Sequence, residues 1–195
     1  MPGISDWLKK ASNDLKASKK LSDDHETFKD FMIFNITQLP PEAWQQYQNL
    51  RLTALELDPL AFGTAYQEAL EMPESHWRDF IKNMWFALID NQPVGMIGLL
   101  RDRGQRVKHR AHIISFWVQP THRGKGIGKK LVQYLQEQAP QQGIRKLYLY
   151  VTSTQEGAIK LYEALGFTKV GLLRENIYHQ DTYFDQYLME WHVAQ

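Results

Sequence analysis

The sequence predicts an α/β domain in which a central mixed sheet is flanked by helices. Short apolar runs alternate with amphipathic segments in the order strand, two helices, three strands, helix, strand, helix and two strands. One strand–helix–strand crossover runs over residues 112–151, so the sheet is expected to be mixed. The chain has 195 residues, of which 43% are hydrophobic, and this is enough for one substantial core.

The first 30 residues differ in pattern from the rest. Apolar residues from Ile4 to Leu15 recur at helical spacing with lysines between them, and the acidic stretch "SDDHE" follows. We therefore predict an N-terminal amphipathic and charged extension over residues 1–30, before a main domain over residues 31–195. A basic amphipathic helix can lie on a membrane surface, dock on its own domain or stay partly disordered, and the pattern leaves these alternatives open.

The main domain is expected to begin with a strand and two helices. Residues 31–37, "FMIFNIT", favour the strand. Pro40 and Pro41 suit the first turn of a helix that continues to Leu57, and Pro73 opens the second helix. Large apolar residues at helical spacing support both helices, among them Trp44, Tyr47 and Leu50 in the first and Trp77, Phe80 and Ile81 in the second.

Three strands are predicted next, over residues 84–90, 94–100 and 111–118. A turn at residues 91–93 separates the first two. The stretch between the last two, "RDRGQRVKHR" at 101–110, is strongly basic and is expected to form a solvated hairpin tip, although it could also recruit an acidic acceptor or RNA.

An amphipathic helix is predicted over about residues 126–139, ended by Pro140 and Gly143. The apolar strand "KLYLYV" at 146–151 follows and is expected to be buried on both faces.

Ser153 and Glu156 have the spacing of a capping box, which predicts that the last helix begins there. Gly166 closes this helix. The segments "FTKVGLL" (167–173) and "YFDQYLMEWHV" (183–193) are expected to be the last two strands.

Composition excludes several classes of function. The chain has no cysteine, so disulfides and thiolate chemistry are excluded. Neither a membrane span nor a secretory signal is recognisable, and we expect a cytoplasmic protein. The formal net charge of +1 argues against nucleic acid as a bulk electrostatic partner. No metal site is expected, because His109 and His112 face opposite sides of their strand.

The segment "VQPTHRGKGIGKKLVQYL" (118–135) places Gly124, Gly126 and Gly128 where a helix begins. Glycine costs roughly 1 kcal/mol in a helix relative to alanine, so three of them indicate a compensating gain. A helix N-terminus has N–H groups without intrahelical partners and a partial positive charge, which suit a diphosphate. Four basic residues add positive charge nearby: Arg123, Lys125, Lys129 and Lys130.

Neither the P-loop spacing nor the dinucleotide spacing fits these glycines, but R-x-x-G-x-G fits Arg123 to Gly128. In this respect the sequence resembles the GNAT superfamily of acyl-CoA-dependent N-acyltransferases. A second segment, "LYVTSTQEGAIKLYEALGFTKVG", is similar to the strand and helix of that family that end in L-Y-x-x-x-G-F, here Leu161 to Phe167. The resemblance covers about residues 31–195 and implies the GNAT-type fold with a twisted mixed sheet.

The resemblance implies that acetyl-CoA is the acyl donor and that no metal is needed. Gln155 departs from the family pattern, which often has asparagine there, but glutamine offers the same donor and acceptor types. The residues expected to bind the cofactor are Phe116, Trp117, Val118, Arg123, Gly124, Lys125, Gly126, Ile127, Gly128, Lys129 and Gln155.

The family chemistry assigns expected roles to a few residues. The strand before the glycines would splay from its neighbour at a bulge, so that a backbone N–H of residues 116–118 stabilises the thioester oxygen. Tyr162 matches the general acid that protonates the leaving thiolate. The general base stays open: His112 has a suitable pKa, other candidates are Glu68, Glu71 and Asp185, and an acceptor amine of low pKa needs no base.

These observations predict an N-acetyltransferase that moves the acetyl group of acetyl-CoA directly to a primary amine of a small molecule or peptide. Residues 62–66 would border the acceptor cleft, and a homodimer is possible. The alternatives are transfer to a protein N-terminus, transfer of another acyl group, and a non-catalytic acyl-CoA-binding module.

Overall fold

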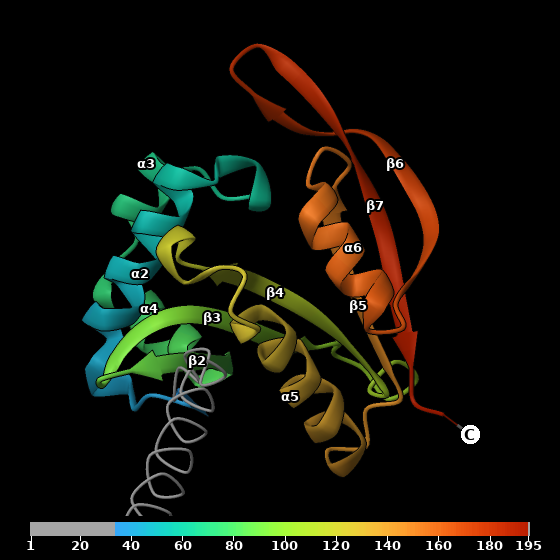
Figure 1. The fold of residues 1–195 in the computed structure, drawn as a ribbon, viewed down its shortest axis with the longest axis horizontal. Helices are drawn as coiled ribbons and strands as arrows, with labels where there is room; N and C mark the ends of the chain where they lie inside the picture. Colours follow the sequence, from blue (N-terminus) through green and yellow to red (C-terminus); the bar gives the residue numbers. More distant parts are fainter. Residues whose placement is uncertain (1–33, 195) are drawn as a thin grey trace, which may run out of the picture. The chain divides into compact units, whose positions relative to one another are not determined.

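The computed structural model describes residues 34–194, in which a seven-stranded sheet carries helices on both faces (Figure 1). The strand order is β1-β2-β3-β4-β5-β7-β6, and β4 and β5 are parallel while the other neighbours are antiparallel. The predicted mixed α/β sheet is therefore confirmed. The predicted extension over residues 1–30 lies outside the described residues, as do residues 31–33 of the first predicted strand.

The first four strands form the antiparallel part of the sheet. The turn between β2 and β3 falls on Asp90 and Asn91, which both have positive φ, as a type I′ turn requires. The predicted turn at 91–93 was placed too late, because Pro93 already pairs with Leu88. The bounds are β1 Asn35–Thr37, β2 Met84–Ile89, β3 Gln92–Arg101 and β4 Arg110–Val118.

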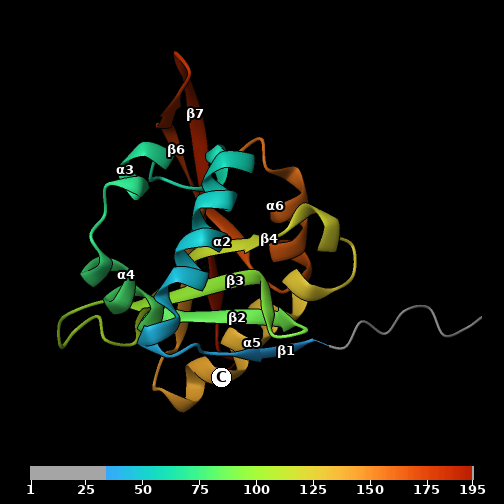
Figure 2. The ribbon, with the colours of Figure 1, turned by 90° about the vertical axis from the view of Figure 1, so that its left-hand side faces the viewer.

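Helices α2 (Trp44–Leu57), α3 (Tyr66–Leu70) and α4 (Glu74–Phe80) cover one face, with α2 in front of β2, β3 and β4 in Figure 2. Tyr47 meets Trp77 and Phe86 edge-on, at 5.5 and 5.8 Å between ring centroids, in the core below α2. Helix α3 has only five residues, which is too short for a hydrophobic periodicity to show, so the sequence did not predict it.

Helices α5 (Ile127–Gln141) and α6 (Glu156–Ala164) lie on the opposite face, on either side of β5 (Lys146–Thr152) in the chain (Figures 1 and 2). Within residues 34–194 no helix is long and apolar enough to cross a membrane. The apolar stripe of α5 is buried against the sheet and contains Ile127, Leu131, Val132, Leu135 and Ala139.

Two predicted helix boundaries were wrong. Pro140 does not end α5 but lies in its last turn, where it removes one backbone hydrogen bond, and the helix ends at Gln141. Ser153 does not cap α6, because it lies three residues before Glu156, where the helix begins; its N–H is bonded to the carbonyl of Asp185 in the neighbouring strand. Gln155 is the N-cap residue instead, and it makes no side-chain capping bond.

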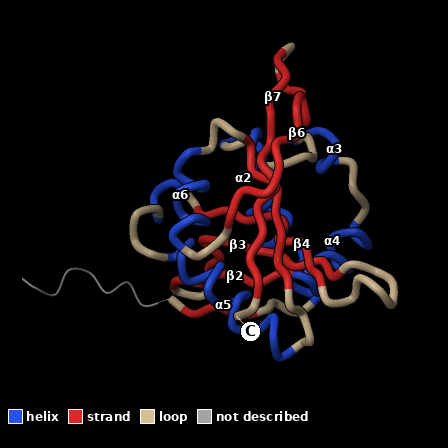
Figure 3. Tube along the Cα trace, turned by 90° about the vertical axis from the view of Figure 1, so that its right-hand side faces the viewer, coloured by secondary structure: helices blue, strands red, loops and turns tan. Residues whose placement is uncertain are grey.

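Strands β6 (Thr168–His179) and β7 (Thr182–His192) form a long hairpin whose tip extends beyond the helices (Figures 1 and 3). Both strands continue further toward their shared turn than the sequence predicted. Gln180 and Asp181 form that turn with positive φ. The hairpin is attached to the rest of the sheet through β5, which pairs with β7 along its full length.

Strands β4 and β5 pair only over Arg110–His112 and Lys146–Tyr148, and then separate. A bulge in β4 accompanies the separation: Ser115 has positive φ, and two residues of β4 lie opposite Ile97 of β3. The splay at a bulge that the family resemblance implied is thus present. It leaves residues 113–118 without a β5 partner.

Close packing around this bulge depends on Gly98. A Cβ added there would lie 2.5 Å from Met84 Sδ and 2.8 Å from Ile114 Cγ1, so we expect Gly98→Ala to lower the free energy of unfolding by about 1–3 kcal/mol. Urea unfolding measures the change. The control is Gly157→Ala in α6, whose added Cβ meets nothing within 4 Å and which should not destabilise. Equal stability of the two variants would contradict this packing.

Candidate active site

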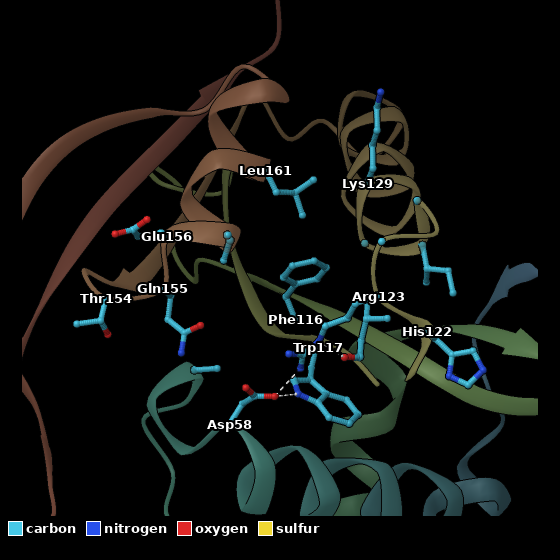
Figure 4. Close-up of a pocket in the computed structure, with 18 residues that line it drawn as sticks. Asp58, Phe116, Trp117, His122, Arg123, Lys129, Thr154, Gln155, Glu156 and Leu161 are labelled. Atoms are coloured by element: carbon cyan, nitrogen blue, oxygen red, sulfur yellow. Dashed lines mark hydrogen bonds and ion pairs between the residues drawn. The ribbon is translucent and has the colours of Figure 1, made fainter. Parts of the chain in front are cut away.

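A cavity of about 820 Å³ opens where the end of β4 faces the starts of α5 and α6 (Figure 4). Ten of the residues predicted to bind the cofactor line it; Lys125 does not, and is exposed on the turn. The lining residues from the predicted set are Phe116, Trp117, Val118, Arg123, Gly124, Gly126, Ile127, Gly128, Lys129 and Gln155.

The three glycines before and inside α5 have different physical roles. Gly124 and Gly126 have φ of +75° and +83°, the left-handed region that favours glycine, and an added Cβ would meet nothing within 4 Å at either position. At Gly128 an added Cβ would lie 3.1 Å from Phe116 Cζ. The first two glycines therefore shape an open turn, whereas Gly128 lets Phe116 pack closely against α5.

The N-terminus of α5 is open to an acceptor. Gly126 is the N-cap residue and has no side chain to cap the helix, and the first intrahelical bond runs from Lys130 N–H to Gly126 O. The N–H groups of the first turn are therefore available as donors next to the cavity. The helix dipole adds partial positive charge at the same place.

Asp58 is a site residue that the sequence did not indicate. Its Oδ2 accepts a hydrogen bond from Trp117 Nε1 at 2.6 Å and from Arg123 Nη2 at 2.5 Å (Figure 4). Arg123 Nε also donates to the carbonyl of Val118 at 2.9 Å. Arg123, one of the residues predicted to bind the cofactor, thus holds the loop before α5 against the end of α2.

The segment after α2 is also fixed to the other side of the cavity. Thr152 Oγ1, at the end of β5, donates to the carbonyl of Leu60 at 2.6 Å. Gln155 follows it on the α6 side of the cavity, while Arg123 approaches from the α5 side (Figure 4). The turn after α2 therefore connects both sides of the opening.

A second cavity, of about 310 Å³, lies on the other side of Phe116 and shares Phe116 and Ala61 with the first. Tyr162 lines this second cavity and not the first, with its ring 5.7 Å from that of Phe116. Burial raises the pKa of Tyr162 well above its usual value of 10, so the phenol keeps its proton. Phe62, at the predicted border of the acceptor cleft, also lines the second cavity.

His112 is the candidate base that the structure places in the second cavity, at the point where β4 leaves β5. It stacks on Tyr148 at 4.9 Å and meets Tyr150 edge-on at 5.2 Å. Burial lowers the pKa of His112, and the nearby Asp102 raises it by a smaller amount. The imidazole is therefore neutral at pH 7 and able to accept a proton.

The carboxylates considered as bases lie elsewhere. Glu68 Oε2 accepts the N–H of Ala65 at the start of α3. Asp185 pairs with Arg174 at 3.0 Å on the long hairpin. Neither residue lines the second cavity, and Glu71 does not line it either.

The chain belongs to the Acetyltransferase (GNAT) family, whose sequence profile matches residues 36–167. The predicted family resemblance is thereby confirmed. The match includes the glycine turn before α5 and the helix that carries Tyr162, up to Phe167.

Curated relatives include N-acetyltransferase 8F1 of Rattus norvegicus, 32% identical over 142 residues, which are 72% of this chain and 58% of that protein. The N-acetyltransferase YdgE of Bacillus subtilis is 26% identical over 151 residues, 72% of this chain and 96% of that protein. The chain spans about half the length of the rat and human relatives that it matches, from 39% to 59%.

Solved structures show the same fold. An acetyltransferase of the GNAT family from Streptococcus pneumoniae superposes with a TM-score of 0.74 at 20% identity, over 83% of this chain and 100% of that one. The yncA protein of Salmonella typhimurium, solved with acetyl-CoA, has a TM-score of 0.73 at 16% identity, over 84% and 95% of the two chains. These structures confirm the predicted GNAT-type fold.

We expect Asp58→Ala to loosen the loop before α5, because it removes the acceptor shared by Trp117 and Arg123. Losing a hydrogen bond to a charged group costs about 1.5–3 kcal/mol, so amide exchange over residues 119–126 should become roughly tenfold faster or more. Hydrogen–deuterium exchange measures this. The control is Asp79→Ala, whose exposed carboxylate pairs with Lys82. Unchanged exchange over 119–126 would contradict the role of Asp58.

Proposed function

We propose that this domain transfers the acetyl group of acetyl-CoA directly to a primary amine. One observation carries the proposal: a single cavity extends from the left-handed turn before α5 to the place where β4 has parted from β5. A ligand in this cavity would present its diphosphate to the turn and its acyl group to the unpaired edge of β4.

The start of α5 suits the diphosphate of coenzyme A. Gly124 and Gly126 leave open space beside their backbone, so phosphate oxygens can approach the amides. The free N–H groups of the first turn would donate to those oxygens, and Lys129 adds positive charge on the lining. Arg123 would contribute indirectly, by holding the loop through Asp58.

The unpaired segment of β4 suits the acyl group. Acetyl-CoA, when bound, supplies the thioester that the amine attacks. N–H groups alternate sides along a strand, so part of the donors in residues 116–118 face the gap rather than β3. Such a donor would stabilise the negative charge that develops on the thioester oxygen, an effect worth roughly 3 kcal/mol in known hydrolases.

The second cavity holds the groups for proton transfer. His112 would take the proton that the attacking amine loses, directly or through water. Tyr162 would hydrogen-bond the leaving sulfur and give it a proton. The raised pKa of Tyr162 makes complete transfer to a thiolate uphill in the free protein, so donation has to accompany the build-up of charge on sulfur.

Release of coenzyme A thiol over a panel of primary amines tests the function. In this assay we expect Tyr162→Phe to lower kcat by about 10²-fold, with the Kd for acetyl-CoA unchanged, because only the proton donor is lost. Tyr183→Phe, on the exposed end of the hairpin, is the matched control. An unaltered kcat in Tyr162→Phe would discard the acid role. Binding of acetyl-CoA without thiol release on any amine would show a binding module instead.

The pH dependence of kcat tests His112. Because burial holds the pKa of His112 below 6.5, we expect kcat to be constant near pH 7 and to fall only below pH 6.5, as the imidazole becomes protonated. His112→Gln should lower kcat and remove this acid limb. The titratable groups next to His112 are Asp102, Tyr148 and Tyr150. An identical acid limb in the variant would assign the titration to another group.

A further inference from the structure

Arg51 lines the second cavity from α2, four residues after Tyr47. Its Cζ lies 4.1 Å from the centroid of the Phe62 ring, so the guanidinium stacks on an aromatic wall. Nη1 of Arg51 is buried and has no hydrogen-bond partner. Within residues 34–194, no other buried side-chain nitrogen or oxygen atom lacks a hydrogen-bond partner.

The charge of Arg51 is also uncompensated. Among the described residues no carboxylate forms an ion pair with it. Burial lowers its pKa, and the opposing influence comes from Tyr47. Burying a guanidinium without an anion or a full set of acceptors is costly, so such a group indicates a ligand that supplies both.

The second cavity suits an anion that carries a single negative charge. Of the described residues that line it, Arg51 is the one lysine or arginine, and none is Asp or Glu. His112 is neutral at pH 7 because burial lowers its pKa. The remaining walls are mostly aromatic or aliphatic. A carboxylate matches one planar guanidinium in charge and in fork geometry, whereas a phosphate dianion would leave negative charge unpaired.

The same cavity contains the groups that would act on an amine. Ser115 and Phe116 of the β4 bulge line it, together with Tyr162 and His112. Its volume of about 310 Å³ is at the lower end for small-molecule sites. An anion at Arg51 and an amine at the bulge would therefore belong to one small molecule.

We propose that the acceptor is a small amine that also carries a carboxylate, as a free amino acid does, and that Arg51 binds this carboxylate. The inference rests on the proposed function and narrows its substrate class. Arg51 and the β4 bulge would hold the two ends of the acceptor. A protein N-terminus, which has a neutral amide in place of the carboxylate, would leave Arg51 unpaired.

The test compares acceptors that differ only at the carboxylate. Each free L-amino acid is assayed beside its amide and its decarboxylated amine, for example phenylalanine, phenylalaninamide and phenethylamine. We expect the wild-type kcat/KM to favour the acid by about 100-fold, mostly through KM, after correction for the different amine pKa values. Amides or amines acetylated as well as the acids would overturn the proposal.

Substitution of Arg51 is the second part of this test. Arg51→Gln should reduce the preference for the acid to near one, and Arg51→Lys should keep part of it, while the Kd for acetyl-CoA stays unchanged. Arg106→Gln removes the same charge from an exposed position in the loop between β3 and β4 and should behave as wild type. A full preference for the acid in Arg51→Gln would contradict the role of Arg51.

Two further readouts separate the possible failures. Should Arg51→Gln not fold, binding of N-acetylphenylalanine and its amide to the wild-type protein decides the point, and equal affinities overturn the proposal. Thiol release with neutral amines but no preference for acids overturns this inference and leaves the proposed function intact. Absence of thiol release with every amine overturns both.

Discussion

Backbone pairing between β4 and β5 stops after three residues of each strand, and the geometry of the site follows from this limit. The bulge at Ser115 turns β4 away, so the edge of residues 113–118 loses its neighbour. One cavity forms on the side of α5 and α6 and another on the side of α2, and Phe116 lines both. An unpaired strand edge between two cavities can meet one reactant from each side.

Long-range contacts hold this gap open in a defined shape. Asp58 ties the end of α2 to Trp117 and Arg123, and Thr152 ties the following turn to the end of β5. The short segment that follows α2 therefore connects the two sides of the larger cavity. The loop before α5 can then keep left-handed glycines and an uncapped helix terminus, because its position is set by these contacts rather than by its own sequence.

The sequence predicted what depends on local pattern: the strands and longer helices, the glycine turn, and Tyr162 within a recognisable segment. It missed what depends on contacts between distant residues. Asp58 and Arg123 are 65 residues apart, and no local pattern singles out Asp58 or Arg51 as a site residue, so neither could be identified before the fold was known. Local rules also failed at the start of α6, where the backbone of Ser153 still bonds to the neighbouring strand at Asp185 and the helix begins only at Glu156. Gly128 was assigned to phosphate access, yet its closest constraint is Phe116.

Binding of a diphosphate by the backbone at the start of α5 is the central claim, and amide NMR tests it most directly. Titration of the ¹⁵N-labelled protein with coenzyme A should shift the amide resonances of residues 124–129 in a saturable manner. Pantetheine, which lacks the diphosphate, should leave the same resonances in place while shifting those of residues 116–118. Unmoved resonances at 124–129 with saturating coenzyme A would contradict the account.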